Sequence, residues 1–234
     1  MQSPSRRDKY TIIIPAAGLG RRMKVYGPKS LIKINDTDTI LSHQINIINS
    51  CFNRCEIIVV GGFQFNKLHS DVENVRFIFN PEYEETNVIY SIGLGLKRAR
   101  TEKVLIIYGD LVFNLDCVNL PFYKESAVVI SDTMKTEEVG CIFNNNVLDS
   151  IFYKLPNKWA HIAFFTGYEL ALLYSICLNE SNSIWYGFEA INNIIASGGQ
   201  FGVFHPNNAR AVDIDSSYDL KLINKHEILN THRQ

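Results

Sequence analysis

Four short apolar runs, each followed by a turn residue, most strongly limit what this chain can fold into. The runs cover Tyr10–Pro15, Glu56–Val60, Val75–Phe79 and Lys103–Tyr108. A segment with helical periodicity lies between the first and second runs, at about residues 39–49, and another lies between the third and fourth, at about residues 87–100. Because strands that alternate with helices at this spacing form right-handed βαβ units, we predict a Rossmann-like α/β fold. Its sheet is expected to be mixed but mostly parallel, with helices on both faces.

The second half of the chain has a different pattern. Strands are expected at Ala127–Ser131, Gly140–Phe143, Val147–Tyr153, His161–Phe165, Phe201–Phe204 and Ala211–Ile214. Helices are expected at Thr166–Leu178, Ile184–Ala196 and from Asp215 or Ser216 to Leu229. Glu169 would complete a capping box in the first of these helices. No linker, repeat or low-complexity segment interrupts the chain, so we predict one domain over residues 1–234.

Charge and hydropathy exclude several classes of function. The 23 Lys and Arg against 24 Asp and Glu give a net charge of −1, and no block of one sign occurs, which argues against nucleic acid or anionic lipid as a partner. No apolar run approaches the roughly 18 residues that a membrane span needs. The N-terminal apolar stretch is short and broken by Pro15, unlike a signal peptide, so we expect a cytoplasmic protein. Nothing in the sequence indicates its oligomeric state.

The five cysteines do not form a recognisable framework. They include no CxxC pair matched by a second pair of cysteines or histidines, and their number is odd. We therefore expect reduced thiols rather than disulfides or a structural zinc site.

A glycine-rich loop follows the first predicted strand. Gly18 and Gly20 let backbone N–H groups turn towards phosphate oxygens, and Arg22 and Lys29 could neutralise a triphosphate from two sides. Arg21 is a third basic candidate, although a solvent-facing position is the commoner one. A dinucleotide motif would need a third glycine where Met23 stands, and the P-loop pattern is absent.

The loop motif, A-A-G-x-G-x-R-M followed by P-K, resembles the opening motif of nucleotidyltransferases with the nucleotide-diphospho-sugar transferase fold. The run 15–29 is particularly similar to methylerythritol-phosphate cytidylyltransferases. The resemblance implies that Arg22 and Lys29 are the catalytic cations. It also implies that the loop residues bind the nucleotide, namely Ala16, Ala17, Gly18, Leu19, Gly20 and Arg21. Arg21 departs from the Thr or Ser of many sugar enzymes, which argues against a hexose-1-phosphate acceptor.

The middle of the chain is similar to a second branch of these enzymes. Residues 75–83 and 86–91 resemble the bacterial phosphocholine cytidylyltransferases, which usually carry two adjacent asparagines where this chain has Asn87-Val88. The resemblance implies that Asn87 and Ser91 contact the base or ribose, and that Gly61 and Gly62 are weaker candidates. Asn87 also suits the N-cap of the following helix, and the two roles can coexist.

Three aspartates are candidate metal ligands. Nucleotidyl transfer needs a divalent cation, and Mg²⁺ prefers carboxylate and phosphate oxygens. Asp110 follows the fourth predicted strand at its carboxyl end, where open α/β sheets place ligands, and the family has a metal-binding aspartate there. The resemblance places the second ligand at Asp213 or Asp215, two residues apart on a predicted strand and hence on one face. Asp215 is slightly preferred, and the other aspartate would cap the last helix.

The acceptor side gives weaker signals. Lys154 matches a family lysine that meets the acceptor phosphate, although Tyr153 replaces the usual glutamate and the proline is displaced by one position. Trp185, Tyr186 and Glu189 would suit an amine or quaternary ammonium group through cation–π attraction, although core packing is the commoner use of such rings. Trp159 shares this ambiguity.

Together, the motifs predict a Mg²⁺-dependent nucleotidyltransferase that transfers CMP from CTP to a small phosphorylated or phosphonylated acceptor. Residues 8–115 would be its nucleotide-binding half and residues 116–234 its acceptor-binding half. Two alternatives stay open. A glycosyltransferase of the same general fold would use a finished nucleotide sugar, but it needs a D-x-D where this chain has Gly109-Asp110-Leu111. A non-catalytic nucleotide-binding domain would bind the triphosphate and release no pyrophosphate.

Overall fold

The computed structural model describes residues 9–18, 27–119, 124–133, 138–225 and 228–229. Nine strands of this part of the chain form one sheet in the order β3-β2-β1-β4-β9-β6-β10-β8-β7. The first four are parallel neighbours: β3 (Arg76–Phe79), β2 (Cys55–Gly61), β1 (Tyr10–Ala16) and β4 (Lys103–Ile107). They match the four predicted runs to within one residue at each end, and they confirm the predicted parallel sheet.

The other half of the sheet is mixed. Its strands are β6 (Ala127–Ile130), β7 (Val139–Asn144), β8 (Val147–Tyr153), β9 (Asn157–Thr166) and β10 (Gly202–Phe204). The long strand β9 runs antiparallel between β4 and β6 and so joins the two halves into one sheet. A separate two-stranded sheet pairs β5 (Leu111–Phe113) with β11 (Ala211–Asp213), which brings the end of the chain beside the end of β4.

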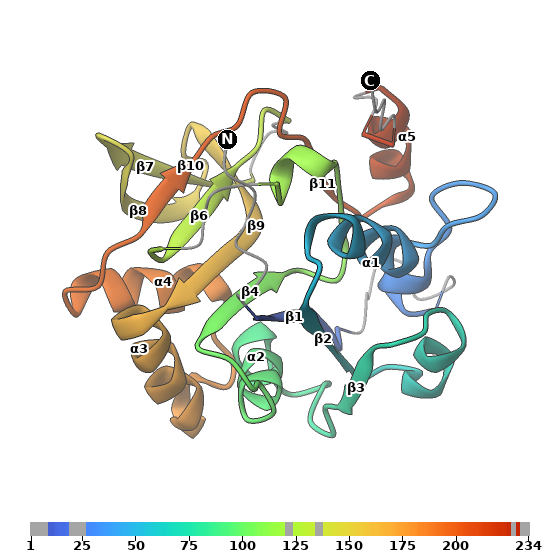
Figure 1. Ribbon diagram of the computed structural model, residues 1–234, viewed down its shortest axis with the longest axis horizontal. Helices are drawn as coiled ribbons and strands as arrows, with labels where there is room; N and C mark the ends of the chain where they lie inside the picture. Colours follow the sequence, from blue (N-terminus) through green and yellow to red (C-terminus); the bar gives the residue numbers. More distant parts are fainter. Residues whose placement is uncertain (1–8, 19–26, 120–123, 134–137, 226–227, 230–234) are drawn as a thin grey trace.

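Helices cover both faces of the sheet, as predicted (Figure 1). They are α1 (Ile40–Cys51), α2 (Val88–Leu96), α3 (Gly167–Leu178), α4 (Gly187–Ala196) and α5 (Ser217–Lys225). Ile12 and Ile14 of β1 pack with α1 in one core cluster, whereas Ile13 packs with α2, α3 and α4 in another. This alternation explains the three consecutive isoleucines, since the strand is buried on both faces. A third cluster joins α5 to β5 and β11.

Several predicted boundaries are wrong. Helix α2 ends at Leu96 instead of Arg100, because its last turn tightens into bonds such as Arg98 N–H to the Gly95 carbonyl. Its basic residues therefore follow the helix. Strand β9 starts four residues earlier than expected, and α4 starts at Gly187. The described part of α5 reaches Lys225, and the next two residues lie outside the described ranges. Strand β5 was not expected.

The predicted capping box at Thr166 does not form. Glu169 instead accepts hydrogen bonds from the Ser126 hydroxyl, at 3.1 Å, and from Gln200 N–H, at 3.0 Å. The Glu169 carboxylate thus joins α3 to the ends of β6 and β10 rather than closing its own helix.

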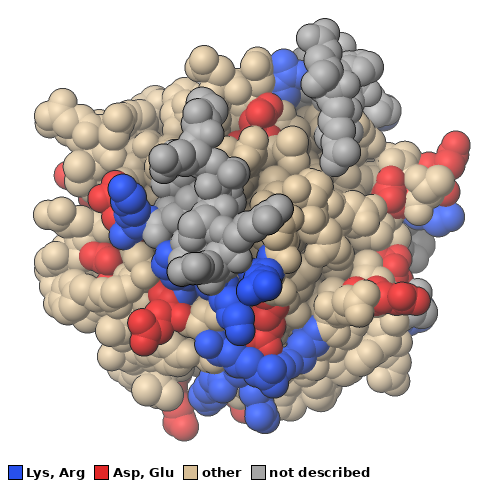
Figure 2. Space-filling view, in the orientation of Figure 1, with Lys and Arg blue, Asp and Glu red and all other residues tan. Residues whose placement is uncertain are grey.

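Basic side chains gather on part of one face (Figure 2). A shallow cavity lined by Lys9, Arg54 and Arg100 lies at the amino ends of β1 and β2. Glu56 lies among these cations and pairs with Arg76, at 2.9 Å, and with Arg100, at 3.8 Å. This cluster occupies the edge of the sheet opposite the carboxyl ends of the parallel strands. No helix in the described ranges is long and apolar enough to cross a membrane.

Candidate active site

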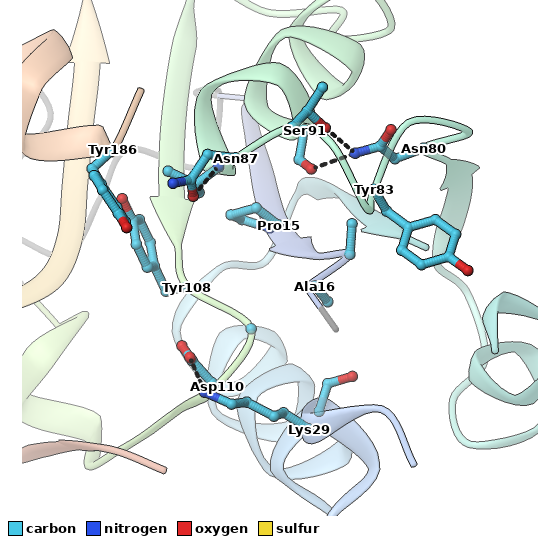
Figure 3. Close-up of a pocket in the computed structure, with 16 residues that line it drawn as sticks. Pro15, Ala16, Lys29, Asn80, Tyr83, Asn87, Ser91, Tyr108, Asp110 and Tyr186 are labelled. Carbon is cyan, nitrogen blue, oxygen red and sulfur yellow. Dashed lines mark hydrogen bonds and ion pairs between the residues drawn. The ribbon is translucent and has the colours of Figure 1, made fainter. Parts of the chain in front are cut away.

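A cavity of about 260 Å³ opens at the carboxyl ends of β1 and β4 (Figure 3). Strand β1 contributes Pro15 and Ala16 to its wall, and the segment after β4 contributes Gly109 and Asp110. The two segments approach closely: a Cβ on Gly109 would lie 2.7 Å from that of Ala16. Glycine at this position therefore lets Asp110 reach the cavity directly beside the end of the first strand.

Lys29 lies in this cavity and bridges two carboxylates whose residues are far apart in the sequence. Its Nζ is 3.2 Å from Oδ2 of Asp110 and 2.5 Å from Oδ1 of Asp215. Burial lowers the pKa of Lys29, but the two carboxylates outweigh burial and leave it raised. Burial raises the pKa of Asp110, and the Lys29 ammonium partly opposes that shift. The structure thus brings together three charged residues that the sequence singled out.

The opposite wall of the cavity is polar and comes from the start of α2. The Asn87 side chain caps this helix by accepting a hydrogen bond from Val88 N–H at 2.8 Å, as predicted. Ser91 is buried and accepts a bond from Asn80 Nδ2 at 3.2 Å. Tyr83 forms another part of the wall. Asn87 and Ser91 therefore lie across the cavity from Lys29 (Figure 3).

The other residues predicted to bind the nucleotide fall into three groups. Ala17 and Gly18 line the same cavity as Ala16. Gly61 and Gly62 do not line it; both are packed, since a Cβ on Gly61 would clash with Leu68 and one on Gly62 with Tyr83. The other candidates lie outside the described residues, namely Leu19, Gly20, Arg21 and Arg22.

A second cavity, of about 700 Å³, adjoins the first. Tyr108, Asp110 and Tyr186 line both cavities, so Asp110 lies where they meet. The second cavity is rich in aromatic rings and carboxylates, whose residues are Tyr153, Trp159, Phe188, Glu138, Asp213, Asp215 and Asp219. A ligand in the first cavity and a ligand in the second would therefore meet beside Asp110.

A buried charge network forms the floor of the second cavity. The Asp213 carboxylate accepts hydrogen bonds from His161 Nδ1, at 2.7 Å, and from Lys158 Nζ, at 3.2 Å. Lys158 also donates to Glu138 at 3.0 Å, and its side chain is fully buried. None of these roles was predicted from the sequence for Lys158, His161 or Glu138. The only sequence signal was their proximity to the predicted acceptor segment.

The prediction that Asp213 and Asp215 share one strand is wrong, because β11 ends at Asp213. Both residues line the second cavity, but their contacts differ: Asp213 belongs to the buried network, whereas Asp215 pairs with Lys29. At the start of the last helix, Asp219 accepts bonds from the N–H groups of Asp215, at 2.9 Å, and Ser216, at 2.8 Å.

Some of the residues predicted to bind the acceptor line a cavity, and others do not. Tyr186 lines both cavities, and Glu189 closes a capping box at α4 by accepting the Tyr186 N–H at 2.7 Å. Trp185 packs against the core cluster beneath α4. Lys154 is exposed at the turn between β8 and β9, with φ of +66°, and it lines neither cavity. Trp159 is buried at the wall of the second cavity.

The carboxylates at the junction suit a divalent cation. Asp110 and Asp215 already converge on a single cationic atom, the Nζ of Lys29. No group of three or more metal-ligating side chains occurs among the described residues. Two hard oxygen donors are nevertheless what Mg²⁺ requires where phosphates and water complete its coordination. These residues therefore fit a metal that is held jointly with a phosphate ligand.

Part of the chain is similar in sequence to known proteins. Residues 12–120 match the family model of the MobA-like NTP transferase domain. The 2-C-methyl-D-erythritol 4-phosphate cytidylyltransferase of Buchnera aphidicola subsp. Schizaphis graminum is 33% identical over 154 residues, covering 64% of this chain and 60% of that protein. The corresponding enzyme of the Acyrthosiphon pisum subspecies is 34% identical over 147 residues. The chain thus matches about 60% of the length of these relatives.

Solved structures share the fold over almost the whole chain. The CTP:phosphocholine cytidylyltransferase of Streptococcus pneumoniae has a TM-score of 0.73 at 20% identity, covering 95% of this chain and 100% of its own. The inositol-1-phosphate CTP transferase of T. maritima has a TM-score of 0.78 at 18% identity, covering 96% and 97%. Residues 12–120 of this chain are therefore similar to the MobA-like NTP transferase domain, and the chain shares the fold of these solved nucleotidyltransferases.

Proposed function

We propose that this protein transfers a nucleoside monophosphate, CMP from CTP, to a small phosphorylated or phosphonylated acceptor and releases pyrophosphate. The observation that carries this proposal is the convergence of Lys29, Asp110 and Asp215 where the two cavities meet. The first cavity would hold the nucleotide and the second the acceptor. The cytidylyltransferases among the relatives and fold neighbours support CTP as the donor.

The reaction needs alignment and charge stabilisation more than proton transfer. An acceptor phosphate oxygen, already anionic at neutral pH, attacks the α-phosphorus in line, and the bond from that phosphorus to the pyrophosphate oxygen breaks. Lys29 would hold phosphate oxygens, and Asn87 and Ser91 would contact the base or ribose. Asp110 and Asp215 would hold Mg²⁺, which when bound offsets negative charge on the phosphates. Arg22 would be a second phosphate ligand.

The second cavity favours an acceptor with a positively charged group. The rings of Tyr186 and Phe188 are stacked at 5.7 Å, and Tyr153 meets Phe188 edge-on at 5.5 Å. Aromatic faces beside carboxylates attract ammonium groups through cation–π and ionic interactions. We therefore propose an acceptor that bears an amino or quaternary ammonium group as well as a phosphate or phosphonate.

A pyrophosphate-release screen tests the proposal. The four NTPs would each be combined with phosphocholine, 2-aminoethylphosphonate, methylerythritol phosphate or a sugar phosphate, in the presence of Mg²⁺. CTP with an amine-bearing acceptor should give the fastest release. A Lys33→Met variant is a matched control, because Lys33 is exposed and lines neither cavity. NTP binding without pyrophosphate release for any pair would support a non-catalytic domain instead.

A further inference from the structure

Strand β9 carries an irregularity at the floor of the second cavity. In the pairing of β9 with β6, Val128 lies opposite Ala163, but Ile130 lies opposite Trp159, so extra β9 residues bulge out between these two pairs. His161 lies within this bulge and has φ of +54°, a left-handed conformation that favours glycine. Such bulges redirect side chains near functional sites, and strained residues concentrate there.

The surroundings of His161 fix its imidazole ring. The ring stacks on Tyr108, with centroids 5.0 Å apart, and meets Trp159 edge-on at 4.7 Å. Asp213 accepts the Nδ1 hydrogen bond. Among the described residues Nε2 has no hydrogen-bond partner, and His161 lines the second cavity. The ring is thus held through one nitrogen while the other is available to a ligand.

Burial and the neighbouring charges act on the pKa of His161 in opposite directions. Burial lowers its pKa, but the Asp213 carboxylate outweighs burial and leaves it raised. Lys158 cannot reach a ligand, because its side chain is fully buried between Glu138 and Asp213. Lys158 and a protonated His161 together balance these two carboxylates. The network as a whole then adds no net negative charge to the cavity floor.

The second cavity otherwise presents acidic groups to a ligand. Of the described residues that line it, His161 alone can carry a positive charge. Four of its carboxylates already have a cationic partner, since Lys29 bridges Asp110 and Asp215, and Lys158 bridges Asp213 and Glu138. An anionic group of the acceptor would therefore be held by His161 rather than by either lysine of these pairs. From this geometry we infer that His161 forms a subsite for the acceptor's phosphate or phosphonate group, in which Nε2 hydrogen-bonds an oxygen of that group. Asp213 is the positioning residue of this subsite, and the exposed Lys154 is not needed for it.

This inference rests on the proposed function, and a pair of variants tests it. His161→Phe keeps a ring between Tyr108 and Trp159 but removes both nitrogens. We expect it to raise the KM for the acceptor by roughly tenfold to a hundredfold, the loss typical of a charged hydrogen bond, and to leave the KM for CTP within about twofold. His205→Phe is the matched control, because His205 pairs with Asp132 away from both cavities. An unchanged acceptor KM in His161→Phe would overturn the subsite.

A spectroscopic experiment separates failure of this inference from failure of the proposed function. Methylphosphonate would be titrated into ¹⁵N-histidine-labelled protein, with the His161 signals identified by their loss in His161→Phe. We expect the His161 Nε2 signal to move, whereas the signals of His43 and His205 stay fixed. A response confined to other histidines, or no response, would overturn the subsite. If the enzyme releases no pyrophosphate in any pairing but Nε2 still responds, the subsite stands and the proposed reaction fails.

Discussion

Lys29 and Asp110 are 81 positions apart in the chain, yet Nζ of the lysine lies 3.2 Å from the aspartate carboxylate at the junction of two cavities. Asp215 approaches the same ammonium group from the other end of the chain. The three residues come from the segment after β1, the segment after β4 and the segment after β11. This convergence is the basis of the proposed reaction, and most of the predictions below test it.

Removing the Lys29 ammonium should damage turnover more than folding. We expect Lys29→Met to lower kcat by about 10²-fold or more, as loss of a preorganised charge does in other active sites. Its thermal unfolding midpoint should change much less, because the lysine is partly exposed and lies at the cavity wall. Steady-state kinetics and thermal unfolding would be measured together, with Lys33→Met as the matched lysine control. A stability loss as severe as the activity loss would count against a catalytic role.

Substitutions of Asp213 and of Asp215 should differ in their effect on metal affinity. Asp215→Asn and Asp110→Asn should each weaken Mn²⁺ or Mg²⁺ binding and abolish most activity, because each removes a hard oxygen donor. Asp213→Asn should leave metal affinity nearly intact and act on the acceptor KM instead, since Asp213 bonds His161 and Lys158. Calorimetry with Mn²⁺ in the presence of CTP is the measurement. Loss of metal in Asp213→Asn alone would reverse this assignment.

Lys29 and a divalent cation should compete for the same carboxylates. Lys29→Met leaves Asp110 and Asp215 without their shared cation, so their repulsion is relieved only by an added ion. We expect Mg²⁺ to raise the thermal unfolding midpoint of Lys29→Met by more than it raises that of the unaltered protein. Ca²⁺ and Na⁺ at matched ionic strength separate site binding from screening. An equal response of both proteins would mean that the carboxylates do not share an ion.

His161 gives a pH-dependent contribution to stability. Because its pKa is raised in the folded protein, protonated His161 stabilises the fold fully below its ordinary value of about 6.5. That contribution is lost as pH rises through the folded-state pKa. The urea midpoint of the unaltered protein should therefore exceed that of His161→Gln by more at about pH 6 than at about pH 9. A difference that grows with pH would show that the folded-state pKa is lowered instead.

The cysteines should be unreactive in the folded protein. Burial raises the pKa of Cys117 and Cys141 to about 12 and that of Cys55 to about 11. Because the thiolate is the nucleophile, alkylation by iodoacetamide near pH 8 should be slow until urea unfolds the chain. Mass spectrometry of labelled peptides gives the rate at each position. Rapid native labelling of Cys117 would contradict its burial in the core.

The parallel half of the fold could be predicted because its signals are local. An apolar run such as Tyr10–Pro15 reports burial on both faces, and a helix-compatible spacing between runs specifies a crossover connection. Asp110 could be placed for the same reason, since it directly follows a strand end. Strand β5 was missed because it depends on a tertiary contact, its pairing with β11 across almost a hundred residues.

The residue contacts around the second cavity could not be predicted, because they join segments that are far apart in the sequence. The signal for an acceptor lysine was a short motif, and it pointed to Lys154, which lies at an exposed turn. The buried Lys158 and the bulged His161 acquire their roles from Glu138 and Asp213, which the antiparallel strands bring beside them. A register shift between two strands leaves no mark in hydrophobic periodicity, so this network could be found only in three dimensions.

The most direct test of the central claim is pyrophosphate release from CTP with an amine-bearing phosphate or phosphonate acceptor, measured for the unaltered protein, Lys29→Met and Lys33→Met. We predict Mg²⁺-dependent release by the unaltered protein and by Lys33→Met, and a loss of about 10²-fold or more in Lys29→Met. Release that is unaffected by Lys29→Met, or absent with every nucleotide and acceptor, would contradict the account.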